Sequence, residues 1–534
     1  MSLVEVKKRQ IETFAYMVEC ISLLIFGHMM KNVGIAYVAI AMECIAFVGL
    51  LLGTNGNLVI GRMLRSKSSK GQYKNALRIR NVLLLFQVLL GIIGTALVIL
   101  GSQVLAEKWL GVPNATFIVM ILAPTILIRM LIAVLLGSFQ GEGSEFPSVA
   151  YAILRQIGII VFGIIFCKIF MAYGHKVSAL LGQEVYTYVY GGMGIALAFL
   201  VTEVFLLIGL GVVSFSKGRS RRQKADEGMR TTDSARTIVV NYTSNRMPYL
   251  LMYALLYLPI ISGLFLYAKK RADAEAIAVG YGNFVGIYMI PCALVILFLS
   301  LMIIPMYGRI VSLMRKEEIR HARNAFSAGV HIVIVNGLFA TVFIACMSDS
   351  IVNWLLGRAN QSASYMMKVG AVFVLLAVFV IFFFGLMRAW GKEKLIIVCA
   401  SLANVVYLLL AAITLNAVNA DVMALVYSGL GAALVLSVGL GYFVYKHIRV
   451  GIEVATQIAI PAAAACVTGL ICIFLEKMLA PHIGSFVTVM VCLIISLGVY
   501  WVILLLLRSF REQEIKYIPG GRVIQMVGHA FHVF

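Results

Sequence analysis

The sequence predicts an all-α polytopic membrane protein with about fourteen transmembrane helices. Of its 534 residues, 62% are apolar and only 13% are charged, whereas soluble domains are about 45–50% apolar and about 25% charged. Apolar runs of the length that crosses a bilayer, about 20 residues, recur along the whole chain. The nine cysteines include no pair at C-x-x-C spacing, so neither a disulfide framework nor a zinc site is indicated.

Fourteen apolar runs are long enough to cross the membrane, after a short polar start. In chain order they cover residues 11–30, 35–61, 81–106, 117–139, 148–173, 188–215, 248–268, 276–307, 327–347, 366–387, 395–415, 422–445, 455–475 and 484–507.

Lysine and arginine are distributed unevenly between alternate loops. With the N-terminus inside, 33 of the 44 lie on the inner side, 10 lie on the outer side, and Arg129 lies in the middle of a span. Short cytoplasmic loops are enriched in these residues, and one missed span would invert every later loop. The bias therefore supports fourteen spans with both ends cytoplasmic. It also assigns the net charge of +21 to topology and to anionic lipid rather than to nucleic acid.

Short motifs recur in the two halves of the chain at nearly constant separation. The matched pairs are Gly61-Arg62 with Gly308-Arg309, the Gly-x-x-Asn motifs at 111–114 and 357–360, and Gly141 with Gly391, at offsets of 247, 246 and 250. Six spans separate the copies, so both halves have the same orientation. This arrangement predicts two six-helix lobes related by a pseudo-twofold axis along the membrane normal, with a cleft between them and alternating access as the motion.

The repeat predicts five segments. These are an N-lobe at 1–215, a basic cytoplasmic linker at 216–246, a C-lobe at 247–450, two further spans at 451–510, and a cytoplasmic tail at 511–534. The apolar pattern of the tail is typical of an amphipathic helix lying on the inner surface. Because the repeat supplies both sides of the cleft, we expect a monomer.

Several of these segments resemble the multidrug/oligosaccharidyl-lipid/polysaccharide (MOP) flippase superfamily. Leu136-Gly137-Ser138-Phe139-Gln140-Gly141, followed by Pro147, resembles the signature of its fourth helix. Residues 304–309 are similar to the exit of its eighth helix, and 385–392 to the end of its tenth. The motif Ile518-Pro519-Gly520-Gly521 resembles the ending of the stage V sporulation protein B-like branch, which is close to the MurJ-type lipid II flippases.

The resemblance implies that the chain moves an undecaprenyl-pyrophosphate-linked oligosaccharide, a precursor of cell wall, capsule or exopolysaccharide with lipid II among the candidates. Transport would run from the inner to the outer leaflet of a bacterial cytoplasmic membrane. The expected partners are the lipid-linked glycan, membrane lipids and a glycan polymerase or envelope-assembly machinery. No cofactor or metal is expected, and Na⁺ or H⁺ is the candidate coupling ion. MurJ-type proteins carry cavity arginines in their first helix, whereas this chain has no Arg or Lys between Arg9 and Lys31.

Cations and amides in or beside the spans are the candidate substrate-binding residues. A charge at the bilayer centre costs at least about 2.5–3.5 kcal/mol, so each one is a functional candidate. Arg129 either binds pyrophosphate in the cleft or forms a buried salt bridge with one of three glutamates. Arg155 and Gln156 begin span five, Arg246 precedes span seven, and Gln140 closes the fourth-helix motif. The alternative role for Arg155 and Arg246 is that of topology charges near the interface.

The candidate ion-coupling residues are acidic or amide side chains inside spans. Glu19, Glu43 and Glu203 are the carboxylates that lie well within apolar runs, and each could bind a proton or Na⁺. The alternative for each is a salt bridge to Arg129. Asn404 could line a cation site or form an interhelical hydrogen bond.

Three other function classes are weighed against the flippase. An ion-coupled multidrug antiporter would share the superfamily, and a non-transporting envelope scaffold would share the span count. A membrane enzyme is disfavoured, because all five aspartates lie in loops and none pairs at short spacing for acid–base or metal-assisted chemistry.

Overall fold

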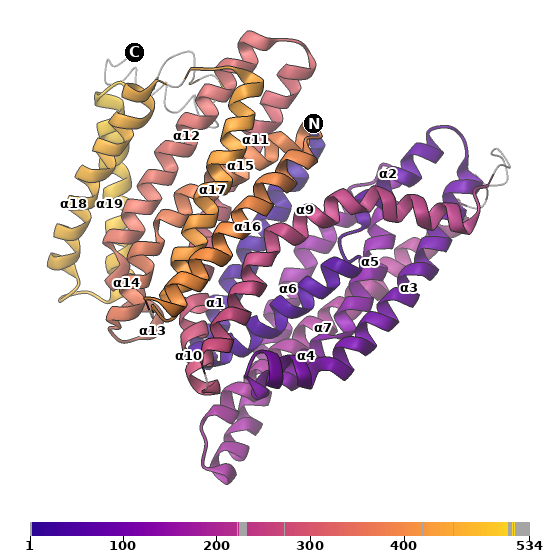
Figure 1. Ribbon diagram of the computed structural model, residues 1–534, viewed down its shortest axis with the longest axis horizontal. Coiled ribbons are helices and arrows are strands. Elements are labelled where there is room, and N and C mark those ends of the chain that lie inside the picture. Colours follow the sequence, from indigo (N-terminus) through magenta and orange to yellow (C-terminus); the bar gives the residue numbers. More distant parts are fainter. Residues whose placement is uncertain are drawn as a thin grey trace. The chain divides into compact units, whose positions relative to one another are not determined.

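The computed structural model describes residues 3–219, 221, 223, 232–271, 273–418, 420–451, 453–510, 515 and 517. Within these ranges every regular element is a helix (Figure 1). The fold class predicted from composition is therefore confirmed. The predicted amphipathic tail helix and the Pro-Gly-Gly motif lie outside the described residues, as does the middle of the basic linker.

The described part of the chain contains thirteen continuous helical segments that are long and apolar enough to cross a membrane. The first of them, Glu5–Ser68, has 64 residues. A straight helix of that length would measure about 96 Å, three times the hydrocarbon core of about 30 Å. Its helical path is broken at Lys31, where φ is 56° and ψ is 175°. This segment therefore supplies two crossings, and the total agrees with the fourteen predicted.

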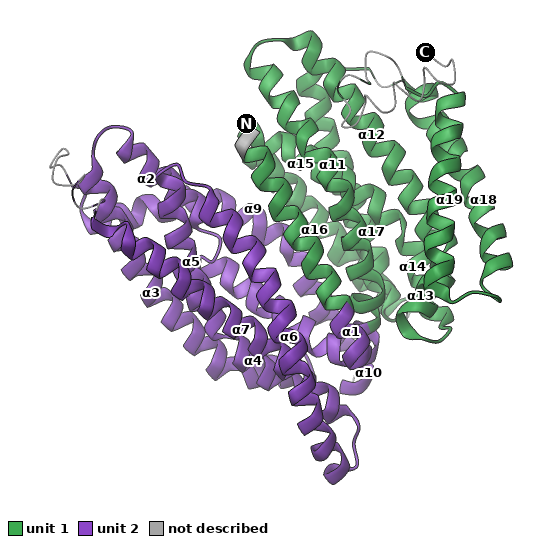
Figure 2. Ribbon diagram, turned by 180° about the vertical axis from the view of Figure 1, so that it is seen from behind, with its two compact units in different colours: residues 1–24, 283–534 green, residues 25–282 purple. Residues whose placement is uncertain are grey.

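The chain forms two compact units (Figure 2). One unit contains residues 1–24 and 283–534, and the other contains residues 25–282. We call them unit 1 and unit 2. The units are defined by packing, and their boundaries at 24 and 282 differ from those of the predicted lobes and linker. The predicted division at 216–246 stays a prediction.

Unit 2 consists of helices, several of which are joined by turns of three or four residues. It contains most of α1 (Leu3–Leu52), then α2 (Asn57–Ser68), α3 (Tyr73–Gln103), η1 (Val104–Trp109), η2 (Pro113–Ala115), α4 (Thr116–Leu122), α5 (Pro124–Gly141), α6 (Phe146–Leu181), α7 (Val185–Ser216), α9 (Ala235–Lys270) and α10 (Ala274–Asn283) up to Gly282.

Unit 1 contains the start of α1 and the rest of the chain. Its further helices are η3 (Phe284–Met289), α11 (Ile290–Arg315), α12 (Ile319–Cys346), α13 (Ser348–Leu356), α14 (Gln361–Gly370), α15 (Val372–Ala389), α16 (Glu393–Asn416), α17 (Met423–Ile448), η4 (Ala455–Ala459), α18 (Ile460–Leu479) and α19 (Ser485–Leu506).

Glycines bring α2 and α5 into close contact. A Cβ atom at Gly137 would lie 2.8 Å from the Asn57 carbonyl oxygen and 2.8 Å from Ile60 Cβ. One at Gly141 would lie 2.6 Å from Leu64 Cβ. Small residues four apart let helix backbones approach closely, which is the usual packing device in membranes. The Gly137–Gly141 motif thus has a direct packing role.

Each unit contains a helix whose hydrogen-bond pattern is interrupted at one alanine while the backbone there keeps helical angles. In unit 2, α4 and α5 meet at Ala123, whose carbonyl accepts a hydrogen bond from Thr95 Oγ1 at 3.3 Å. In unit 1, α14 and α15 meet at Ala371, whose carbonyl accepts from Thr341 Oγ1 at 3.3 Å. The offsets between these pairs match those of the sequence motifs. The local structure therefore supports the predicted internal repeat.

The last two spans pack on one helix of unit 1. Side chains of α18 and α19 form a core with α12, in which the Tyr500 hydroxyl donates to the Val335 carbonyl at 2.8 Å. At the end of α19, the buried side chains of His331 and Ser509 lie 3.1 Å apart. These two polar contacts, one from Tyr500 and one from Ser509, fix the rotation of α19 against α12.

An ion pair joins the end of the basic linker to α2. Lys67 Nζ lies 2.9 Å from a carboxylate oxygen of Asp233, and the Asp233 amide donates to Asn75 Oδ1 at 3.1 Å. The hydrogen bond from Lys67 lowers the pKa of the Asp233 carboxyl below its ordinary value. The pair is partly exposed, so it fixes the start of α9 without a large contribution to stability.

Candidate functional site

Two arginines share one carboxylate in the core of unit 2. Arg129 Nε and Arg155 Nε each donate to Glu203 Oε1 at 2.9 Å. The Tyr151 hydroxyl donates to the second oxygen, Oε2, at 2.9 Å. The Arg155 guanidinium also lies over the Phe199 ring, 5.7 Å from its centroid. These five side chains form what we call the Glu203 cluster.

Helix periodicity brings the Glu203 cluster together. Tyr151 and Arg155 are four residues apart on α6, and Phe199 and Glu203 are four apart on α7. Residues at this spacing share a helix face, and α6 and α7 pack against each other along their length. Arg129 reaches the same carboxylate from α5. Of the three partners considered for Arg129, the structure selects Glu203.

The cluster contains one carboxylate and two guanidinium groups. Glu203 has a side chain that is 1% exposed and it carries one negative charge against two guanidinium groups. The Arg129 side chain remains 26% exposed. Within the described part of the chain, its recorded bond to Glu203 uses Nε alone. Its other N–H donors have no hydrogen bond recorded among the described residues.

Arg246 binds the end of a helix. Its guanidinium donates to the carbonyls of Leu50, Leu51 and Leu52, at 2.6, 2.8 and 3.0 Å. These are among the last carbonyls of α1, and the last four carbonyls of a helix accept no hydrogen bond from the helix itself. A cation at a helix C-terminus is also favoured by the helix dipole. These three bonds occupy the two Nη groups of Arg246, whereas its Nε is buried without a hydrogen-bond partner among the described residues.

The two candidate amides lie in the core of unit 2. Gln140 is buried, and its Nε2 donates to Ser148 Oγ at 2.9 Å, which links α5 to the start of α6. Gln156 is buried on α6 next to Arg155. Gln140 thus holds the turn between two helices.

Glu43 is bound by a tyrosine from another helix. The Tyr281 hydroxyl of α10 donates to Glu43 Oε2. Tyr257 of α9 stacks on Phe47, one turn along α1, and lies within electrostatic reach of both Glu43 and Arg129. The carboxylate of Glu43 is therefore part of a polar region in unit 2 rather than an isolated group.

The remaining two ion-coupling candidates lie in unit 1. Glu19 is partly buried on α1. Asn404 is buried on α16, and its Nδ2 donates to the Ala400 carbonyl of the same helix at 2.8 Å. Both residues thus belong to unit 1, whereas the Glu203 cluster belongs to unit 2. No group of three or more His, Cys, Asp or Glu side chains suited to a metal ion occurs among the described residues.

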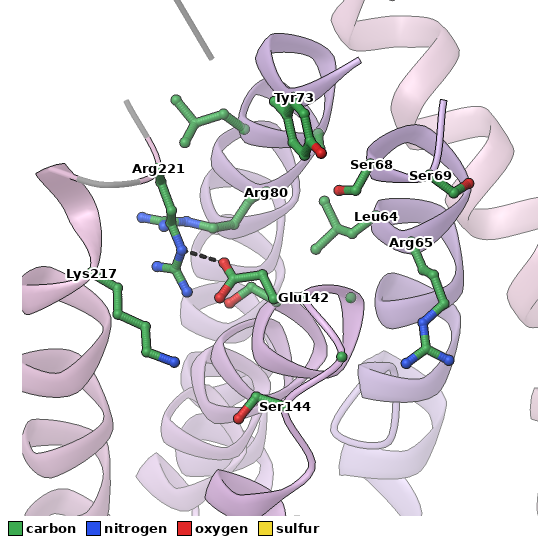
Figure 3. A pocket seen from close by; sticks show the side chains of 15 residues that line it. Leu64, Arg65, Ser68, Ser69, Tyr73, Arg80, Glu142, Ser144, Lys217 and Arg221 are labelled. Carbon is green, nitrogen blue, oxygen red and sulfur yellow. Dashed lines mark hydrogen bonds and ion pairs between the residues drawn. The ribbon is translucent and has the colours of Figure 1, made fainter. Parts of the chain in front are cut away.

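A second polar region is a cavity of about 610 Å³ at one end of unit 2 (Figure 3). Its lining includes Arg65, Arg80, Lys217 and Arg221, together with Glu142. None of these residues was a candidate from the sequence, because all lie near loops, where basic residues are expected for topology. Tyr151, Phe199 and Tyr281 were also missed. The signal for Tyr151 was available, since it lies one helical turn before Arg155.

The fold is similar to that of solved transporters. A MATE-family multidrug resistance transporter of the MOP superfamily, in an inward-facing conformation, has a TM-score of 0.61 at 14% identity over 82% of this chain and 95% of its own. Lipid II flippase MurJ in an inward closed conformation has a TM-score of 0.62 at 12% identity over 92% of this chain and 97% of its own.

A third similar structure is a MOP superfamily transporter from Pyrococcus furiosus, for which a binding pocket of reverse polarity suggests a different function. Its TM-score is 0.55 at 14% identity, over 84% of this chain and 95% of its own. No protein-family model and no curated protein matches the sequence. The chain therefore has the fold of the MOP transporters, as its motifs suggested, and at these identities the likeness is one of fold.

Proposed function

We propose that this chain, which has the fold of the MOP transporters, is a flippase for an undecaprenyl-pyrophosphate-linked oligosaccharide. The substrate would move from the inner to the outer leaflet of a bacterial cytoplasmic membrane by alternating access. Both termini would be cytoplasmic. The observation that carries the proposal is the Arg129 guanidinium, which is bonded to the buried Glu203 through Nε while its side chain remains 26% exposed.

A pyrophosphate headgroup suits this cluster. Arginine binds phosphate oxygens through two parallel N–H bonds, and such charge-assisted bonds are roughly twice as strong as neutral ones. Glu203 holds each arginine through Nε and so fixes the plane of the guanidinium. An arginine fixed in this way loses little freedom when it binds a ligand. The cluster is therefore suited to an anionic headgroup that enters a low-dielectric interior.

The test is transbilayer movement in proteoliposomes that contain the full chain. A labelled undecaprenyl-pyrophosphate sugar is placed in one leaflet and its exposure is followed with an impermeant reagent. We expect R129Q to slow movement by about ten- to a hundredfold, because a hydrogen bond to a charged group is worth about 1.5–3 kcal/mol. R129K should retain an intermediate rate, since it keeps the charge and loses the fork.

The matched control is R236Q, which removes one positive charge from an exposed position on α9. It should move the lipid at the wild-type rate. Equal rates for R129Q and wild type would remove Arg129 from the headgroup site. If wild type moves no labelled lipid with several glycans, and with and without Na⁺ or pH gradients, the flippase proposal fails and the scaffold alternative gains.

An ion-coupled exporter of small molecules is the second candidate. It is favoured by Glu43, a carboxylate within a membrane helix of unit 2 that accepts a hydrogen bond from Tyr281. Such a group can couple transport to H⁺ or Na⁺. For this function E43Q should abolish gradient-driven export of an organic cation from the same proteoliposomes. A flippase without ion coupling should be insensitive to E43Q.

A further inference from the structure

The cavity at the end of unit 2 carries more positive than negative charge. The described residues that line it include four cations and one carboxylate, Glu142. It lies between the end of α2, the start of α3, the turn after α5 and the end of α7 (Figure 3). Along α5, Ser138 of the cavity wall is about 14 Å from Arg129. The cavity is thus separate from the Glu203 cluster.

Arg221 is bonded on two sides, and one of its nitrogens has no partner among the described residues. Its Nε donates to Glu142, and its Nη1 donates to the Ser214 carbonyl at 3.1 Å and to Ser214 Oγ at 2.9 Å. The guanidinium lies over the Phe139 ring, 5.3 Å from the centroid. Its Nη2 is buried without a hydrogen-bond partner among the described residues. Buried polar groups are almost always bonded, so this donor needs an acceptor.

Arg80 leaves a second donor in the same cavity. Its Nε is also buried without a hydrogen-bond partner in the described structure. Arg80 and Arg221 are close enough to repel each other electrostatically, and Glu142 offsets only one of the two charges. Lys217 adds a third cation, 5.2 Å from the centroid of the same Phe139 ring. An anion bound between these cations would reduce their mutual repulsion.

We propose that this cavity binds a phosphate group carried by a larger molecule. A phosphate presents several acceptor oxygens and two negative charges, which match two arginines with unused donors. The hydroxyls of Ser68 and Ser144 also line the cavity and would bind further oxygens. Cavities of about 300–1,000 Å³ take ligands larger than an inorganic ion. The source is either a phospholipid headgroup or a soluble organic phosphate.

The test measures binding to the full-length protein with two probes. Inorganic pyrophosphate is titrated into protein in an uncharged detergent. In parallel, thermal unfolding is followed in nanodiscs of phosphatidylcholine with and without phosphatidylglycerol, since a ligand that binds the folded state raises Tm. A soluble source predicts binding of pyrophosphate alone, and a lipid source predicts stabilisation by phosphatidylglycerol. The absence of both effects would overturn the proposal.

Three variants locate the effect. R80Q and R221Q should each weaken binding by about tenfold or more, whereas R78Q, at an exposed position on α3 outside the cavity lining, should stay within about twofold. E142Q removes the competing carboxylate and should tighten binding. A misfolded protein cannot gain affinity, so this variant tests the site even if an arginine variant is unstable. Wild-type affinity in both R80Q and R221Q would overturn the assignment.

Discussion

Three buried charged side chains of unit 2 are bonded to partners that come from other helices. Arg246 binds three carbonyls at the end of α1, and Glu43 accepts from a tyrosine of α10. Glu203 accepts from two arginines and a tyrosine. Removing one partner of such a group leaves the other buried and unbonded, which costs more than the bond itself contributes. Single substitutions can therefore separate structural from functional charges.

Arg246→Gln should lower stability and leave the headgroup site intact. The glutamine cannot reach three carbonyls at once, so the end of α1 loses its cap. Hydrogen bonds to charged groups contribute about 1.5–3 kcal/mol, and we expect a loss of about 2 kcal/mol, seen as a lower Tm in detergent. R236Q, at an exposed position, should change stability by less than about 0.5 kcal/mol.

A different outcome would restore Arg246 to the substrate site. If R246Q keeps the wild-type Tm and loses transport of the labelled lipid, its contacts with α1 are not its main role. If it loses both, transport should be compared at a temperature where the variant is fully folded.

The sequence indicated which residues carry buried charge but not how they pair. Arg129 and Glu203 were both recognisable as charges inside apolar spans, and a salt bridge between them was one of three pairings left open. Arg129 and Glu203 are 74 residues apart in the sequence, so their pairing depends on the contact between α5 and α7, which only the structure shows. The cavity residue Arg80 could not be singled out, because basic residues near loops also have a topological role.

At the scale of helices, the repeat extends from sequence to hydrogen bonding. Thr95 and Thr341 each bond the carbonyl at the interruption of a helix, in unit 2 and unit 1 respectively. The loops before these interrupted helices also match, since Gly111 and Gly357 both adopt positive φ, at 62° and 66°. The Gly-x-x-Asn motif marked this loop in the sequence. Pro124 in the sequence predicted the interruption in unit 2, whereas the one in unit 1 could not be predicted because valine follows Ala371.

Close packing of α2 on α5 makes Gly137 sensitive to any side chain. Gly137→Ala places a Cβ atom 2.8 Å from the backbone oxygen of Asn57, which cannot move aside without shifting α2. Overpacking of this kind costs about 1–3 kcal/mol. We expect a lower Tm together with faster hydrogen exchange in α2 and α5.

The matched control for that variant is Gly209→Ala on α7, where a Cβ atom has no neighbour within 4 Å. Because alanine favours the helix by about 0.5–1 kcal/mol over glycine, this variant should be at least as stable as wild type. Destabilisation of both variants by the same amount would show that helix backbone effects, not the α2–α5 contact, explain the result.

At the scale of the whole molecule, the topology depends on the break at Lys31. If Glu5–Ser68 crosses the membrane twice, the residues before and after it lie on the same side. The charge bias independently requires this, since Lys7 and the basic stretch at 62–80 were both assigned to the cytoplasm. The apolar runs and the charge bias of the loops together predicted the number of spans. The position of the turn was predictable only to a few residues, because the flanking apolar runs continue almost without a polar gap.

Labelling of single cysteines tests this topology. In a background that lacks the nine native cysteines, K7C and K74C should both be protected from an impermeant maleimide added outside, and Q183C should react. All three positions are exposed in the structure. Permeabilised cells, in which all three should react, provide the control. Protection of only one of K7C and K74C would mean that α1 and α2 cross the membrane once, which would invert every later loop. The cations of the cavity in unit 2 would then lie on the outer side, away from cytoplasmic phosphates.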